Sequence, residues 1–237
     1  TTYAANWYLE DGSVTVNADN SGQTVTQGGT STPDEAPVIT QRESSVETGN
    51  TIAINAAENV TANVTISDVN INTSGAAVST NGKGNVNIEL DGINTLKSGR
   101  EHAGLEKSKD GKLTITDENG NGKLIATGGE YGAGIGGGSK GNGSNITITG
   151  GEVTATGGTN GAGIGGGLQK NGEKIIVSGD ATIKVQGGPT DTWDGAGAGI
   201  GNGGSHNGAY NSWSLTPVNG AETEPDTSNL TTGKIEY

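Results

Sequence analysis

The chain has 237 residues, of which 29% are hydrophobic and 45 are glycine, and its net charge is −13 at pH 7. So few apolar residues would not fill a two-layer globule, but they are enough for the narrow core of a solenoid. The negative charge opposes binding to DNA or RNA, because that association is driven by basic residues that displace counterions. No stretch approaches the roughly 20 apolar residues of a membrane-spanning helix, so we expect neither nucleic-acid partners nor membrane insertion.

Residues 1–62 are expected to form N-terminal strands that make the first coil and cap one end of the core. A solenoid needs such a cap because its terminal coil otherwise exposes unpaired strand edges. The two prolines of Ser31–Pro37 predict a loop between strands. The strands themselves are predicted from alternating residues at Gly12–Val16, Gln23–Thr26, Val38–Thr40 and Thr51–Ile54.

Residues 63–212 are expected to contain the repeated coils, because two kinds of short alternating segment recur there. Alternation places every second residue on one face, as a strand with one buried side requires. The first strand of each coil is predicted at Val64–Ile66, Val86–Ile88, Leu113–Ile115, Ile146–Ile148 and Ile175–Val177, and the repeats are laid over one another by these segments. The second is predicted at Asn70–Asn72, Thr95–Lys97, Leu124–Thr127, Val153–Thr156 and Thr182–Val185.

The third strand of each coil is predicted from a glycine-rich phrase that occurs at Gly132–Gly136, Gly161–Gly165 and Gly197–Gly201, with a fainter copy at Ala103–Glu106. Its interval of roughly 30 residues suits one turn of a solenoid and is shorter than a four-stranded propeller blade. We expect Ile135, Ile164 and Ile200 to stack in register inside the core, while the glycines let neighbouring coils approach closely. The predicted fold is an all-β, right-handed parallel β-helix with about three short strands per coil.

The repeats resemble glycine-rich β-helix repeat proteins of the bacterial cell surface. The resemblance is carried by Asn85–Gly99 and by Gly150–Gly158 running into Gly161–Gly167, and it covers about Gly49 to Gly204. Such proteins are common in Gram-positive gut bacteria and are often labelled carbohydrate-binding. The resemblance implies an extracellular or cell wall-anchored location and a glycan or host surface ligand. This chain departs from the pattern at Pro189–Asp194, where an insertion enlarges the loop before the last glycine phrase.

Catalytic residues are not expected in this chain. β-helix enzymes that cleave acidic polysaccharides need either a base with cations that neutralise a uronate or two converging carboxylates. The chain has only 13 Lys and Arg and two His, and no predicted strand carries paired carboxylates. The densest functional cluster, Arg100–His102, is expected on a solvated turn between strands. The sequence therefore predicts a protein that is not an enzyme.

A cofactor is not expected either, with calcium kept as an alternative at one loop. Asp117, Asn119 and Asn121 present oxygen ligands at alternate positions, as in the first half of an EF-hand loop. The bidentate Glu of that motif is missing, because Gly128 stands at the twelfth position. Ordinary turns use the same residues, so the sequence leaves both interpretations open.

A sugar-binding site would combine an aromatic face for pyranose C–H groups with polar side chains for hydroxyls. Aromatic residues make up only 3% of the chain, so their placement is informative. Asp191, Trp193 and Asp194 lie in the inserted loop, and Tyr210 and Trp213 follow the next glycine phrase. We predict that these five residues meet at one edge of the solenoid and bind the ligand. The alternative is that the tryptophans only pack the ends of the core and their own loop.

The leading functional prediction is a non-enzymatic, secreted adhesin or glycan-binding module. We expect it to be a monomeric part of a larger surface protein, with residues 213–237 as a C-terminal cap or linker. A structural stalk that holds another domain away from the cell is the first alternative. A lyase or hydrolase of acidic polysaccharides is the second.

Overall fold

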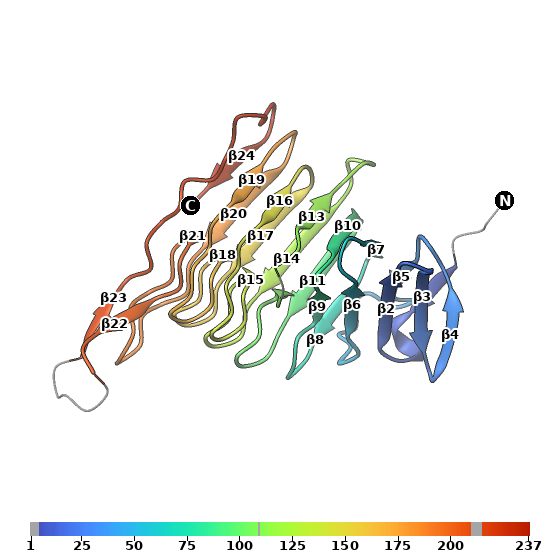
Figure 1. Ribbon diagram of the computed structural model, residues 1–237, viewed down its shortest axis with the longest axis horizontal. Coiled ribbons are helices and arrows are strands. Elements are labelled where there is room, and N and C mark those ends of the chain that lie inside the picture. Colours follow the sequence, from blue (N-terminus) through green and yellow to red (C-terminus); the bar gives the residue numbers. More distant parts are fainter. Residues whose placement is uncertain (1–4, 109, 210–214) are drawn as a thin grey trace.

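The computed structural model describes residues 5–108, 110–209 and 215–237 and shows an almost entirely β structure. The strands form a β-solenoid of about 6 turns with about three strands per coil, which confirms the predicted parallel β-helix. Figure 1 shows the coils side by side in chain order along the long axis of the molecule. Within the described ranges the helical structure is one 3-10 turn, Leu9–Asp11, and no helix is long and apolar enough to span a membrane.

Three sheets enclose the core. The first contains β1 (Asn6–Tyr8), β5 (Val38–Thr40), β7 (Thr61–Ser67), β10 (Asn85–Asp91), β13 (Leu113–Thr116), β16 (Ile146–Ile148) and β19 (Ile175–Val177). The second contains β8 (Asn70–Asn72), β11 (Ile93–Lys97), β14 (Lys123–Thr127), β17 (Glu152–Thr156), β20 (Thr182–Gln186) and β24 (Lys234–Glu236). The third contains β2 (Val14–Asp19), β6 (Ile52–Ala56), β9 (Val78–Gly82), β12 (Leu105–Lys107), β15 (Ile135–Gly136), β18 (Ile164–Gly165) and β21 (Ile200–Gly201), extended by β3 (Gly22–Gln27) and β4 (Thr30–Pro33).

The predicted isoleucine ladder is confirmed. Ile135 pairs with Ile164, which pairs with Ile200, all in parallel register and fully buried. The register of the first sheet differs from the prediction in one place, because Val64 lies opposite Ile88 rather than Val86. The shift is two residues, so the same face is buried and the core pattern is unchanged.

The glycine phrase is explained by contact between coils. A Cβ atom on Gly132 would lie 2.1 Å from the carbonyl oxygen of His102 in the preceding coil. The corresponding distances are 2.0 Å from Gly161 to Gly132 and 1.9 Å from Gly197 to Gly161. Backbones this close leave no room for a side chain, so the repeated glycines are required by stacking.

The two ends of the solenoid are built differently. At the N-terminal end, β2 pairs in parallel with β6 and forms an antiparallel hairpin with β3, which pairs in turn with β4. The loop predicted for Ser31–Pro37 is partly a strand, since β4 extends to Pro33. Proline is tolerated there because β4 is an exposed edge strand. At the C-terminal end, β24 pairs with β20, and β22 (Ser205–Asn207) pairs with β23 (Thr216–Val218).

Candidate functional site

The inserted loop between β20 and β21 is a turn closed on itself. The Oδ1 atom of Asp191 accepts hydrogen bonds from the backbone N–H groups of Trp193 at 2.8 Å and Asp194 at 2.7 Å. The backbone N–H of Asp191 donates to the carbonyl oxygen of Asp194 at 3.1 Å. These bonds fix the backbone on both sides of Trp193, whose side chain extends outward so that the residue is 56% exposed.

Asp194 anchors this loop to its neighbours. Its Oδ1 atom accepts a hydrogen bond from Nδ1 of His206 at 2.7 Å and from Nε2 of Gln169 at 2.9 Å. The His206 and Asp194 side chains are only 8% and 6% exposed. Asn160, fully buried in the preceding coil, donates its amide to the carbonyl oxygens of Asp194 and Gly195 at 3.0 and 2.9 Å. The carboxylate of Asp194 therefore positions the loop and does not face solvent.

The five predicted ligand residues are only partly placed together. Asp191, Trp193 and Asp194 share one turn, with the Trp193 side chain exposed and the Asp194 side chain buried. Tyr210 and Trp213 lie outside the described residues. The support from His206 and Gln169 was not predicted, although His206 lies close to Tyr210 in the sequence.

At the predicted calcium loop, the Asp117 carboxylate accepts hydrogen bonds from the backbone of its own turn. Its Oδ1 atom is 2.9 Å from the Gly120 nitrogen and 3.2 Å from the Asn121 nitrogen. The Asn121 side chain donates to Asp91 in the preceding coil at 2.9 Å, and Asn119 lies exposed between them. No group of three His, Cys, Asp or Glu residues that could hold a metal ion is found among the described residues. Calcium binding here stays a prediction.

The structure also shows a groove of about 750 Å³ that was not predicted. Its lining residues come from three successive coils, within 101–110, 138–145 and 173–174. Among the described residues that line it, none has an apolar side chain. The lining comprises Glu101, His102, Glu106, Lys107, Ser108, Asp110, Gly138, Ser139, Lys140, Gly141, Asn142, Ser144, Asn145, Glu173 and Lys174.

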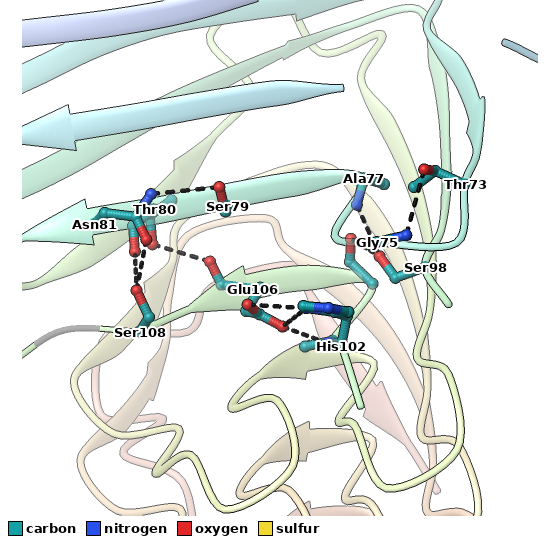
Figure 2. Close-up of polar contacts among 12 residues, drawn as sticks. Thr73, Gly75, Ala77, Ser79, Thr80, Asn81, Ser98, His102, Glu106 and Ser108 are labelled. Atoms are coloured by element: carbon teal, nitrogen blue, oxygen red, sulfur yellow. Dashed lines mark hydrogen bonds and ion pairs between the residues drawn. The ribbon is translucent and has the colours of Figure 1, made fainter. Parts of the chain in front are cut away.

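One wall of the groove carries a histidine held by a carboxylate (Figure 2). Nδ1 of His102 donates to Oε2 of Glu106 at 3.0 Å, and the same oxygen accepts the backbone N–H of Ala103 at 2.9 Å. The imidazole is 40% exposed. Ser139 lines the same groove within the sequence Gly137–Gly141, but its hydroxyl makes no hydrogen bond with any described residue. Among the described residues, the side chains of His102 and Glu106 therefore have no serine nucleophile bonded to them.

Lys107 lines the groove, but most of its side chain lies in the core of the solenoid. It lies opposite Thr80, which in turn lies opposite Ile54, so its aliphatic stem occupies a position in an interior ladder. The residue is 2% exposed. Burial lowers the pKa of its ammonium group from 10.5 to about 8, and the nearby Asp110 opposes the shift.

Comparison of the chain with family models, with curated proteins and with solved structures finds no match.

Proposed function

We propose that the protein is a non-enzymatic glycan-binding module that acts outside the cell and stacks its ligand on Trp193. The observation that carries the proposal is an indole ring, on a residue 56% exposed, on a turn whose backbone is fixed on both sides by Asp191. Tryptophan is enriched at binding surfaces because its ring combines a large apolar face with an N–H donor, so its exposure on a fixed loop favours a binding role.

The surroundings of Trp193 suit a sugar. A pyranose offers an apolar C–H face to the indole and a rim of hydroxyl groups that need acceptors and donors. The Oδ2 atom of Asp191 accepts no hydrogen bond from the part of the chain that the structure describes, so it is available to a ligand hydroxyl. The indole N–H of Trp193 likewise has no partner among those residues and can donate.

Rigidity supports the proposal further. The hydrogen bonds from His206, Gln169 and Asn160 hold the loop in one conformation before any ligand arrives. A ligand that meets an ordered loop does not spend binding free energy on ordering it. The parallel ladder beneath the loop provides the stiff support, as it also would in a structural stalk.

A glycan-array screen with and without calcium tests the proposal. We expect binding to neutral glycans that is unaffected by chelation, and loss of the same signals for Trp193→Ala. Ile93→Ala is the matched control, because Ile93 is 55% exposed at the start of β11, on the second sheet. An array on which the wild-type protein binds no glycan would contradict the proposal and favour a stalk.

A further inference from the structure

The groove and the Trp193 loop lie on the same edge of the solenoid. Along this edge the connections from the second to the third sheet stack coil on coil through backbone hydrogen bonds. The N–H of Glu101 donates to Glu130 at 2.7 Å, that of Tyr131 to Thr159 at 2.9 Å, and that of Asn160 to Pro189 at 2.9 Å. We call residues 100–102, 130–131, 159–160 and 189–195 the loop edge.

The loops that follow the third sheet fold back onto the loop edge. Ser139 donates its backbone N–H to Glu101 at 2.8 Å, Leu168 to Tyr131 at 2.9 Å, and Gly204 to Asn160 at 2.7 Å. The groove lies at the first of these contacts, and Gly204 directly precedes the strand that carries His206. Since paired strands are about 4.8 Å apart, the three coil steps from Glu101 to Pro189 span about 14 Å.

An arginine and an aromatic side chain connect the groove end of the loop edge to the next coil. Arg100 lies 3.4 Å from the carboxylate of Glu130, and its guanidinium stands 5.3 Å from the centre of the Tyr131 ring. A hydrogen bond to Glu130 raises the pKa of Tyr131, and the negative charge of Asp191 adds to this shift. The backbone bonds from Tyr131 to Thr159 and from Asn160 to Pro189 continue the loop edge from this cluster to the Trp193 loop.

We propose that the groove, the Arg100–Tyr131 pair and the Trp193 loop form one elongated site for a single neutral oligosaccharide. This inference rests on the proposed function, because it extends the Trp193 site along the loop edge. An edge of about 14 Å is longer than one sugar ring, so several sugar units are needed to reach both ends.

The chemistry of the groove selects the ligand class. A sugar hydroxyl both donates and accepts hydrogen bonds, and the groove offers acceptors on Glu101 and Glu173 and donors on Lys140, Lys174 and Asn142. The absence of apolar side chains among its described lining residues disfavours lipids and aromatic ligands. Positive and negative groups alternate in the lining, and the whole chain carries −13, so a polyanion gains no net attraction.

The test is a comparison of ligand lengths by isothermal titration calorimetry. The probes are cello-, chito- and malto-oligosaccharides, each from the monosaccharide to the hexasaccharide. Trp193→Ala removes one end of the site, and His102→Ala with Lys140→Asn removes the other. Asn suits position 140 because Lys140 has a φ of 61°, a conformation that Asn tolerates. The control is Lys97→Asn, on the exposed face of β11.

We expect affinity to rise with length in one series until the ligand spans the edge. The groove variant should then weaken hexasaccharide binding at least about tenfold and leave disaccharide binding unchanged, whereas Trp193→Ala should weaken both. If Trp193→Ala weakens binding but the groove variant leaves the hexasaccharide unaffected, the elongated site is wrong and the proposed function stands. If no series binds, the elongated site for these neutral oligosaccharides is wrong, and the glycan array decides the proposed function separately. If a series binds and Trp193→Ala changes nothing, both proposals are wrong.

Discussion

Lys107 lies directly opposite Thr80 in the parallel register of β12 and β9, inside the core of the solenoid. Its pKa of about 8 means that, between pH 8 and 10.5, the unfolded chain keeps a proton that the folded chain has lost. The free energy of unfolding therefore rises with pH across this window, and the penalty for burying the ammonium group is full below it.

Lys107→Met is expected to stabilise the protein at pH 7 by about 2–3 kcal/mol, because it keeps the stem and removes the buried charge. The variant should also lose the part of the pH dependence that Lys107 contributes between pH 8 and 10.5. Urea unfolding of both proteins at several pH values measures the difference. Parallel stability curves for wild type and variant across this window would contradict the account.

The Asp194–His206 pair provides a second prediction. His206→Leu leaves the carboxylate of Asp194 buried with a weakened set of donors, which is expected to cost about 3 kcal/mol of stability. Adding Asp194→Asn to this variant removes the buried charge and should recover most of the loss. Chemical denaturation of the single and double variants measures the coupling. Equal stability of the two would show that the Asp194 charge is not what His206 compensates.

Gly161→Ala is expected to destabilise the solenoid by about 3 kcal/mol or more, because the new methyl group would overlap the Gly132 carbonyl of the neighbouring coil. Gly75→Ala is the matched control, since nothing lies within 4 Å of a Cβ atom there. Thermal unfolding of both variants measures the contrast. Similar melting temperatures for the two would mean that the coils are not packed as closely as described.

No lyase, hydrolase or esterase activity is expected. The His102–Glu106 pair has no bonded nucleophile among the described residues, and the acidic groups of the groove offset its lysines against a uronate. Incubation with pectin or alginate, followed by ultraviolet absorbance, detects elimination, and p-nitrophenyl acetate detects acyl transfer. Turnover that disappears in His102→Ala would show that the groove is an active site.

The parts of the fold that follow from repetition were predictable from the sequence. Two-residue alternation identifies the buried face of each strand, and the recurring phrase aligns Ile135, Ile164 and Ile200. Alternation does not fix register, because a shift of two residues buries the same face. The sequence therefore aligns Val64 with Val86, whereas the structure pairs it with Ile88. The burial of Lys107 was not predicted because the residue is charged, although it lies two residues after the buried Leu105 and therefore on the same face of the strand.

The candidate site was less predictable because it depends on contacts between coils. The length and composition of the Pro189–Asp194 insertion identified the loop, but only the structure shows that Asp194 faces inward toward His206. The groove is lined by residues of three successive coils that lie far apart in the sequence, and no local motif records that they meet. The pairing of His102 with Glu106, four residues later, depends on the conformation of the turn between them, which the sequence does not specify.

Trp193 is expected to bind a glycan and not to serve packing. The most direct measurement is calorimetric titration of a glycan that binds the wild-type protein into Trp193→Ala and into Ile93→Ala, with the melting temperature of each. We predict at least about tenfold weaker binding for Trp193→Ala, an unchanged melting temperature, and wild-type behaviour for Ile93→Ala. Unchanged affinity, or unfolding of Trp193→Ala, would contradict the claim and identify Trp193 as a packing residue.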